Sequence, residues 1–364
     1  QEYWSIETVL HDPKSKKDFN AKYYGKKGKE VKLNNAEETK KVSDAIANAD
    51  FVIEKVKRGQ QKRNPQPPFT TSTLQQDASR KYNFQAAKTM QIAQTLYEGI
   101  NLGGKIGTIG LITYMRTDSL RIADDAQKEA VAYLTENYGS EYVKAKQYKT
   151  KKNAQDAHEA IRPTSINIKP IDIKDKLTND QYRLYKLIWE RFAASQMTSA
   201  VYDTMQVTID ANGHTFKASG SNIKFKGYMT VYVESTDNKE KKEKMLPNLE
   251  ENQTVTLKSS EEKQHFTQPP ARYSDATLIK ELEENGIGRP STYAPTIATI
   301  LDRHYVEREA KQLKPTSLGI VITDLMKGHF ERIVDAKFTA QMESDLDKIE
   351  AGKADWVEVL GKFY

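Results

Sequence analysis

The chain has 364 residues, a length that allows two to four domains at about 100–200 residues each. Its 56 Lys and Arg against 50 Asp and Glu give a formal net charge of +6, which permits a polyanionic partner without requiring one. The sequence contains no cysteine, which excludes disulfides, cysteine nucleophiles and thiolate zinc sites. It has no apolar run near the ~18 residues of a membrane span, no signal peptide and no initiating Met, so we expect an intracellular fragment of a longer protein.

Residues 1–68 have a mixed α/β pattern. Apolar and polar side chains alternate over residues 4–8, which predicts a half-buried strand, and residues 51–56 predict another. A capping-box pattern at Asn35 predicts the start of a helix. The lysine-rich residues 14–32 are interpreted as a solvated loop or hairpin, with phosphate contact as the alternative.

Residues 59–68 contain three prolines and are expected to form an extended linker into a helical region at residues 69–197. Thr73 and Thr178 are each followed three residues later by Gln, which predicts two helix starts. A short apolar strand is expected at residues 109–113, after a glycine-rich stretch. The apolar faces of the predicted helices contain Ala86, Met90, Ala93, Tyr97, Ile122, Ala126, Ala130, Tyr133, Leu184, Leu187, Ile188 and Phe192.

Residues 198–268 change to the period of two that is typical of strands. An Asn-Gly pair at 212–213 predicts a tight hairpin. Further strands are expected at 228–233 and 254–257, on either side of a charged loop at 237–244. The preceding helical region therefore lies between two strand-rich segments, which predicts one β-rich domain with a helical insertion.

Residues 269–364 begin after a Pro-Pro boundary and are predicted to be mostly helical. The acidic residues within 345–350 resemble a carboxylate metal cluster at first sight. An amphipathic helix with Met342, Leu346 and Ile349 turned inward would instead place them on a solvated face, so we expect no metal site here. Residues 25–29 lack the spacing and the Ser/Thr of a P-loop, so we expect no nucleotide hydrolysis.

Residues 110–119 read as the end of an apolar strand from which polar groups emerge. Tyr114 and Arg116 are two residues apart and share a face in an extended chain. A phenol, with a pKa near ~10, needs a cation nearby to act as a nucleophile. A guanidinium can hold two phosphate oxygens. The pair is therefore a candidate for phosphoryl transfer, with a structural strand end and an Arg–Asp pair as the alternative.

Residues 158–164 carry a second pair of candidate phosphate-binding groups. A helical turn ended by Pro163 would place His158 and Arg162 on one face, because they are four residues apart. Both side chains can donate to a phosphate. The alternative is an ordinary surface His–Arg pair.

Residues 286–293 combine glycines, which permit a close backbone approach, with hydroxyls that precede a predicted helix. Ser291 or Thr292 would cap this helix, and its N-terminus beside Arg289 would attract an anion. The alternative is a helix cap without a ligand.

Taken together, these segments resemble type IA DNA topoisomerases over nearly the whole chain. The resemblance implies a multi-domain α+β fold, in which a β-rich arch domain is interrupted by a helical Tyr-bearing domain and followed by a mostly helical DNA-binding domain. The segments follow in the order of the family, and those at 110–119 and 286–293 are highly specific in combination. They are residues 68–75, 110–119, 157–164, 273–305 and 338–343.

The resemblance and the boundaries predict four parts of the chain. Residues 1–68 and 198–268 would form the arch, residues 69–197 the helical domain that carries the nucleophilic Tyr, and residues 269–364 part of the DNA-binding domain. Residues 69–75 would be the hinge between the arch and the Tyr-bearing domain.

In that family, the tyrosine at the position of Tyr114 attacks a DNA phosphodiester, forms a 5′-phosphotyrosine link and frees a 3′-hydroxyl. Arg116 matches an arginine that assists at the scissile phosphate, and Asp118 matches an acidic position beside the active site. The resemblance therefore implies an isomerase that relaxes negatively supercoiled DNA without ATP, by single-strand cleavage and strand passage.

The resemblance also implies DNA-binding residues. His158 matches a histidine linked to DNA binding and cleavage, with Arg162 as its helper. Arg289, Ser291 and Thr292 match positions that contact the backbone of single-stranded DNA. The implied partners are single-stranded and negatively supercoiled DNA in the cytoplasm, at the nucleoid, with no membrane partner.

The family's Toprim domain, which supplies the Mg²⁺ ligands and an activating Lys, is not visible in the sequence. The implied cofactor is therefore Mg²⁺ held outside this chain by a Toprim domain of the same polypeptide, with no ATP and no zinc. We expect the chain alone to be inactive in relaxation. The alternatives are a single-stranded DNA-binding module without catalysis and a structural clamp that binds no DNA.

Overall fold

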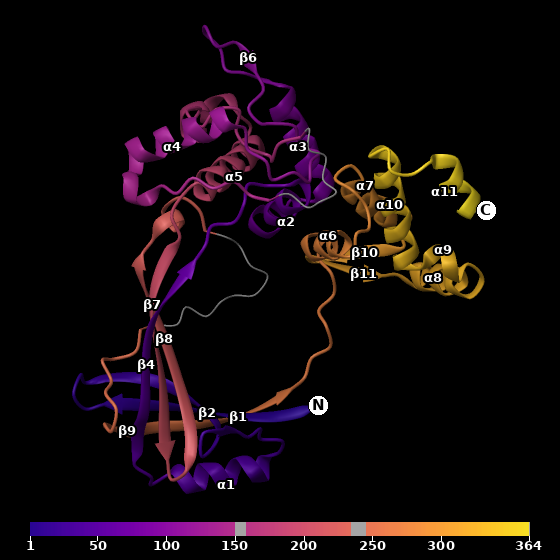
Figure 1. Cartoon of the computed structure of the whole chain (residues 1–364). Helices are drawn as coiled ribbons and strands as arrows, with labels where there is room; N and C mark the ends of the chain where they lie inside the picture. Colours follow the sequence, from indigo (N-terminus) through magenta and orange to yellow (C-terminus); the bar gives the residue numbers. More distant parts are fainter. Residues whose placement is uncertain (150–157, 234–244, 364) are drawn as a thin grey trace. The chain divides into compact units, whose positions relative to one another are not determined.

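The structure is a computed structural model that describes residues 1–149, 158–233 and 245–363. The charged loop expected at 237–244 lies outside these residues. The chain divides into two compact units, whose elements are labelled in Figure 1. The first unit contains residues 1–64, 199–227 and 245–270, and the second contains residues 65–198, 228–233 and 271–363. Contacts divide the chain in two, and the four-part scheme stays a prediction.

An antiparallel sheet forms the first unit, with the strand order β1-β9-β4-β7-β8-β2-β3. Because β1 also pairs with β2, six of these strands close into a ring. Arg63 pairs with Ala200, so the chain leaves the sheet at the end of β4 and returns beside it in β7. The strands are β1 (Glu2–Asp12), β2 (Lys17–Lys26), β3 (Lys29–Glu30), β4 (Phe51–Arg63), β7 (Ala200–Ala211), β8 (His214–Phe225) and β9 (Thr254–Phe266).

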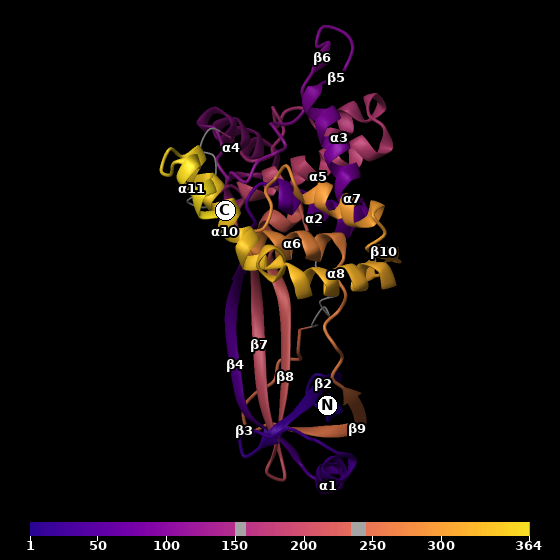
Figure 2. The ribbon, with the colours of Figure 1, turned by 90° about the vertical axis from the view of Figure 1, so that its right-hand side faces the viewer.

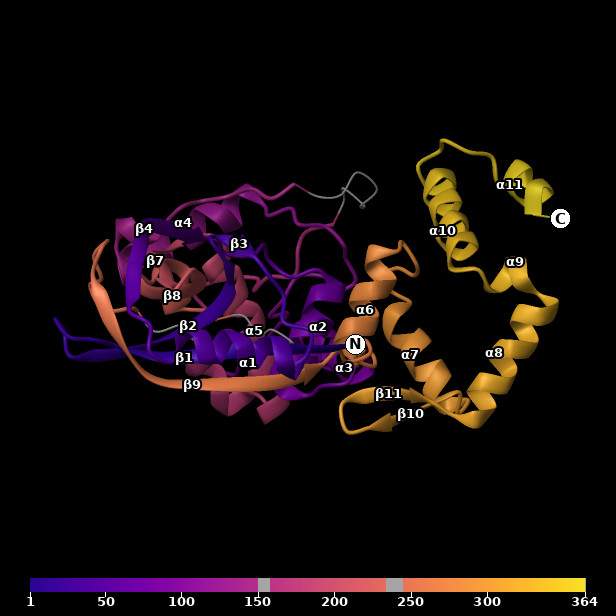
Figure 3. The ribbon, with the colours of Figure 1, turned by 90° about the horizontal axis from the view of Figure 1, so that it is seen from below.

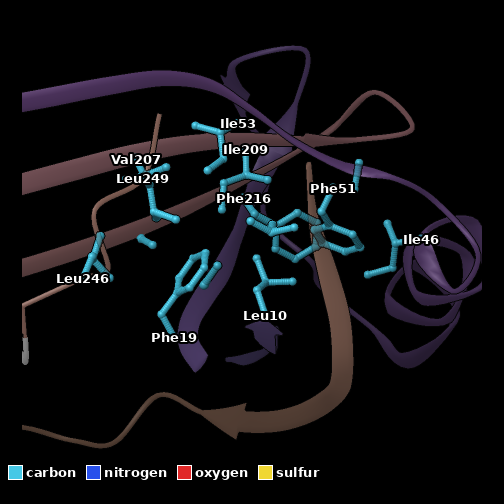
Figure 4. Packing of buried hydrophobic residues seen from close by; sticks show 14 of the residues in the cluster. Leu10, Phe19, Ile46, Phe51, Ile53, Val207, Ile209, Phe216, Leu246 and Leu249 are labelled. Atoms are coloured by element: carbon cyan, nitrogen blue, oxygen red, sulfur yellow. The ribbon is translucent and has the colours of Figure 1, made fainter. Parts of the chain in front are cut away.

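The alternation predicted for the first strand is confirmed, since Ile6, Thr8 and Leu10 of β1 are buried. The Asn212-Gly213 hairpin is also confirmed: both residues have positive φ, and β7 pairs with β8 around them. Helix α1 (Ala36–Ile46) begins at the expected cap, where the side chain of Asn35 accepts from the backbone N–H of Glu38 at 2.9 Å. Figure 4 shows the core, which includes Leu10, Phe19, Ile46, Phe51, Ile53, Val207, Ile209, Phe216, Leu246 and Leu249.

Two expectations for the first unit and its border are wrong. The linker expected from residue 59 begins only after Arg63, because residues 59–63 continue β4 and pair with β7. The strand expected at 228–233 is not formed: Gly227–Thr230 makes a 3₁₀ turn, η3, in which Val231 donates its N–H to Tyr228. The hairpin interpretation of the lysine-rich residues 14–32 is confirmed, because they contain β2, which pairs with β1 before it and with β3 after it.

The second unit is mainly helical. Helix α2 packs against α6, and α3 packs against α5 and α7 (Figures 2 and 3). The helices are α2 (Thr71–Tyr82), α3 (Ala86–Glu98), α4 (Asp124–Tyr138), α5 (Asn179–Ser195), α6 (Asp275–Glu284), α7 (Tyr293–Asp302), α8 (Ser317–His329), α9 (Glu331–Val334), α10 (Ala336–Glu350) and α11 (Trp356–Phe363), with 3₁₀ turns η1 (Ser140–Tyr142) and η2 (Pro170–Lys176). The short strands are β5 (Ile100–Asn101), β6 (Thr108–Ile109), β10 (Val306–Glu309) and β11 (Gln312–Pro315). In the described ranges, no helix is both long and apolar enough to span a bilayer.

The helix signals of the second unit were right in kind and partly wrong in position. The capping box at Thr178 is confirmed. Thr73 does not begin α2, because Thr70 is the N-cap and Thr73 is the third residue of its capping box. The strand expected at 109–113 is limited to β6, and Ile112 instead makes an isolated bridge with Pro163.

Glu7 and two lysines form a charge cluster across three strands of the sheet. Glu7 of β1 pairs with Lys22 of β2 at 2.8 Å and with Lys263 of β9 at 2.7 Å, and these hydrogen bonds lower the pKa of Glu7 from 4.5 to about 2. A lowered pKa stabilises the fold above the ordinary pKa, and this contribution is lost as the pH falls toward 2. We expect Glu7→Gln to lower the free energy of unfolding at pH 6 by roughly 0.5–1 kcal/mol, and by much less at pH 2.5. Urea unfolding measures this loss as a lower midpoint.

The matched control for this prediction is Glu54→Gln, at an exposed position of β4. It should not reproduce the pH-dependent difference. Equal losses for Glu7→Gln at both pH values would contradict the assignment.

Candidate active site

The loop that carries Tyr114 is anchored to the start of α2. The hydroxyl of Thr71 donates to the carbonyl of Met115 at 2.7 Å and accepts from the N–H of Thr117 at 2.9 Å. Met115 and Thr117 are buried, whereas Tyr114 and Arg116 between and beside them are exposed. The alternation predicted for an extended chain therefore turns the phenol and the guanidinium outward together.

The ring of Tyr114 lies against two other rings. Its centroid is 5.5 Å from that of Tyr97, in an edge-to-face arrangement at 69°, and 5.3 Å from that of His158, tilted by 47°. The phenol nevertheless remains accessible, since Tyr114 is 36% exposed. The structure thus brings His158 to the candidate nucleophile, as a group of the same site.

The guanidinium of Arg116 is only partly engaged. One terminal nitrogen donates to Oε1 of Gln94 at 3.2 Å, and the residue is exposed. The charged group is therefore exposed, two residues from the phenol along the chain, and can meet a phosphate.

The segment around His158 is extended, which corrects the predicted helical turn. Ile161 bridges Phe69, and Pro163 bridges Ile112, so the backbone groups that a helix would use are paired across neighbouring segments. His158 and Arg162 do not share a helical face. The guanidinium of Arg162 is instead held by Glu159, with nitrogen–oxygen distances of 2.6 and 2.8 Å.

The segment that joins α6 to α7 is held against α10. Arg289 makes a two-point contact with Asp347, with Nε to Oδ1 at 3.1 Å and a terminal nitrogen to Oδ2 at 2.7 Å. The backbone N–H of Gly288 donates to Glu343 at 3.1 Å. The candidate DNA-binding guanidinium is therefore already paired with a carboxylate in this structure.

The contacts of α10 correct its predicted orientation. Met342 and Leu346 are 40% and 53% exposed instead of turned inward, whereas Ile349 is half-buried. The polar side of the helix faces the α6–α7 segment, because Glu343 and Asp347 bind Gly288 and Arg289 there.

The hydroxyl residues before α7 are placed differently from the prediction. Thr292 is the N-cap, but its hydroxyl accepts from the backbone N–H of Arg289 at 2.8 Å and makes no described capping bond into the helix. The physical reason is its backbone, which is already helical at φ −112° and ψ −16°, so its side chain does not face the helix N–H groups. Ser291 is exposed.

The charge of Asp118 on the Tyr114 loop affects Tyr293 at the start of α7. Burial raises the pKa of Tyr293, and the negative charges of Glu283 and Asp118 raise it further. Glu283 in turn accepts from the hydroxyl of Ser72 at 2.5 Å. The carboxylates of Glu283 on α6 and of Asp118 on the Tyr114 loop thus both act on Tyr293, the first residue of α7.

The residues that the structure describes contain no group of three or more His, Asp or Glu placed to hold a metal ion. The acidic cluster considered on α10 is occupied by cations, since Asp345 pairs with Lys348 at 2.6 Å and Asp347 pairs with Arg289. The side chains present therefore do not fit a Mg²⁺ site within the described part of the chain.

Sequence reasoning missed four residues of this site. The sequence places Tyr97 only on an apolar helix face, Asp347 only in the acidic cluster and Glu343 only in a segment shared with the family, and it assigns nothing to Gln94. The only local signal is the spacing of Gln94 and Tyr97, which are three apart and so neighbours on α3. Their contacts with a loop some 20 residues further along the chain depend on the tertiary fold.

Comparison with known proteins identifies relatives of the chain. A family model described as DNA topoisomerase matches residues 1–361. Among solved structures, the chain is similar to full-length topoisomerase I from Thermotoga maritima, with 38% sequence identity and a TM-score of 0.83. The match covers 100% of this chain and 57% of that chain, so this chain spans little more than half the length of that relative.

Proposed function

Since this chain belongs to the type IA DNA topoisomerase family, we propose that its site cleaves and rejoins one DNA strand, with Tyr114 as the nucleophile. The observation that carries this proposal is the accessible phenol of Tyr114, in ring contact with His158 and two residues from the exposed Arg116. Repeated cleavage, strand passage and rejoining would relax negatively supercoiled DNA in the cytoplasm.

The chemistry follows from the groups at the site. The phenol oxygen of Tyr114 forms a bond to the phosphorus, the bond from phosphorus to the 3′-oxygen breaks, and the phenol proton is passed on so that a 3′-hydroxyl results. Arg116 holds the non-bridging oxygens and balances the charge that develops on them. The 5′-phosphotyrosine keeps the energy of the broken ester, so reversal by the 3′-hydroxyl rejoins the strand without ATP.

The family implies that Mg²⁺ supports this reaction in the complete enzyme. The described residues offer no set of ligands for it, so we assign no step to the metal. We propose that a Toprim domain supplies that site, as a partner of this chain in the same polypeptide.

The proposed DNA path joins two segments. His158 would contact the strand beside the nucleophile, with Arg162 acting indirectly because Glu159 holds it. Arg289, Ser291 and Thr292 would contact the backbone further along. We also propose that the first unit serves as the arch around the passing strand and that residues 69–75 form its hinge.

The proposal is tested by mixing the chain with a separately made Toprim domain, Mg²⁺ and a single-stranded oligonucleotide labelled at its 3′ end. A protein–DNA band that survives denaturation is expected, because the part of the strand on the 3′ side of the break stays on the tyrosine. A 5′ label should be released instead. Label retention from the 5′ end, or no band with either label, would overturn the proposal.

The chain alone is expected to leave supercoiled plasmid unrelaxed in the presence of Mg²⁺, because its described residues provide no ligand set for the ion. Agarose gel electrophoresis measures this directly, with the complete enzyme as the positive control. Relaxation by the purified 364-residue chain would show that the metal requirement is met within it.

A further inference from the structure

The last turn of α3 supports the backbone of the catalytic loop. The N–H of Leu111 donates to the carbonyl of Leu96 at 2.8 Å. At Gly110, a Cβ would lie 2.6 Å from the carbonyl oxygen of Tyr97, so only glycine allows the loop to come this close. The loop that ends in Tyr114 is therefore fixed against this turn from its first residues.

Two side chains of the same turn reach the reactive groups themselves. The ring of Tyr97 meets that of Tyr114 edge to face, and Oε1 of Gln94 accepts from Arg116 at 3.2 Å. The amide of Gln94 is oriented by its other end, because Nε2 donates to Glu98 at 2.6 Å. One helix turn thus contacts the phenol and the guanidinium separately.

We propose that Gln94 and Tyr97 are positioning residues for the cleavage step. The inference rests on the proposed function, in which Tyr114 is the nucleophile. An exposed tyrosine ring can sample several side-chain rotamers. The rings of Tyr97 and His158 both contact the ring of Tyr114 and so restrict its rotamers. The side chain of Gln94 orients the guanidinium of Arg116 through its hydrogen bond. The phenol oxygen of Tyr114 and the guanidinium of Arg116 are then held in fixed relative positions before DNA binds.

A positioning role makes a specific kinetic prediction. Misplacement of a reacting atom by ~1 Å can cost about 10²-fold in rate. Loss of the Tyr97 ring should therefore slow cleavage without weakening DNA binding. Tyr97 is itself 41% exposed, so the competing role is a surface on which a base stacks, and its loss would then weaken binding.

The experiment uses the enzyme in which this chain is joined to its Toprim domain, with Mg²⁺ and 3′-labelled single-stranded DNA. We measure the single-turnover rate of covalent adduct formation and, separately, the affinity for DNA. Tyr97→Leu is expected to lower the rate by about 10–100-fold with unchanged affinity. Tyr97→Phe, which keeps the ring, should restore the rate to within about twofold of the parent.

The matched control is Tyr3→Leu, because Tyr3 is 43% exposed and also stacks on a histidine ring, that of His265 in the first unit. It should leave the rate unchanged. For Arg116, Gln94→Met removes the acceptor at similar size, and Gln91→Met, at an exposed position one turn earlier on α3, is its control. We expect Gln94→Met to slow adduct formation severalfold.

An unchanged rate in Tyr97→Leu and Gln94→Met would overturn the inference, as would a fall in affinity that accounts for the whole effect. If Tyr114→Phe still formed the adduct, the proposed function itself would fail, which is a different outcome. The ¹³C-tyrosine NMR signal of Tyr114 gives a second measurement on the chain alone. Its ring signal should shift in Tyr97→Leu and stay in place in Tyr3→Leu, and an unshifted signal in Tyr97→Leu would count against the ring contact.

Discussion

Replacing Tyr114 by Phe is expected to abolish the covalent protein–DNA adduct completely. The substitution removes only the oxygen that would bond to phosphorus and keeps the ring that contacts Tyr97 and His158. The fold and the affinity for single-stranded DNA should therefore be unchanged. Denaturing gels with 3′-labelled DNA, Mg²⁺ and the Toprim domain measure the adduct, and fluorescence anisotropy measures the affinity.

The control for this result is Tyr3→Phe, which should form the adduct at the parental level. An adduct that persists in Tyr114→Phe would assign the nucleophile to another residue. Loss of DNA binding together with loss of the adduct would show instead that the hydroxyl belongs to the DNA-binding surface.

The second large effect is expected at the ion pair between α10 and the α6–α7 segment. Asp347 binds Arg289 at two points, which is also the geometry by which a guanidinium binds a phosphate. If Arg289 binds the DNA backbone as proposed, the carboxylate and a phosphate compete for the same face of the guanidinium. Asp347→Asn should tighten single-stranded DNA binding by about fivefold, which corresponds to ~1 kcal/mol for loss of a partly exposed ion pair.

The salt dependence of binding tests whether an additional phosphate contact causes the tighter binding. The plot of log affinity against log salt should become steeper by about 0.7 for each additional phosphate bound. Arg289→Ala should weaken binding and make the plot shallower. Asp345→Asn is the matched control, since it removes the same charge from the same helix and breaks the pair with Lys348 instead. An equal effect of both Asp substitutions would mean that only net charge matters.

Local signals predicted much of the fold, because they depend on neighbours in the sequence. The alternation in β1, the Asn-Gly hairpin and the Thr178 capping box each specify a local conformation, and the structure confirms them. The strand at residues 59–63 could not be predicted in this way, because these residues are exposed and carry no apolar alternation. Their strand conformation is set by pairing with β7, more than 130 residues away along the chain.

The candidate site was predictable to a similar depth. The spacing of two residues predicted that Tyr114 and Arg116 share a face of an extended segment, and the structure shows that this face is the exposed one. The extended conformation of residues 158–164 was not predictable, since Ile161 and Pro163 are bridged by Phe69 and Ile112 from elsewhere in the chain. The same holds for Asp347, which reaches Arg289 only through the docking of α10.

The adjacency of Arg63 and Ala200 has a consequence for how such a chain can change. Residues 65–198 connect β4 to β7, two strands that a short hairpin turn could also connect. The entropic cost of closing a loop grows only slowly with its length, so the strand register tolerates a whole folded body at that place. A segment inserted between two paired strands can thus be enlarged, trimmed or exchanged over evolution, while the strand order and register of the sheet stay the same.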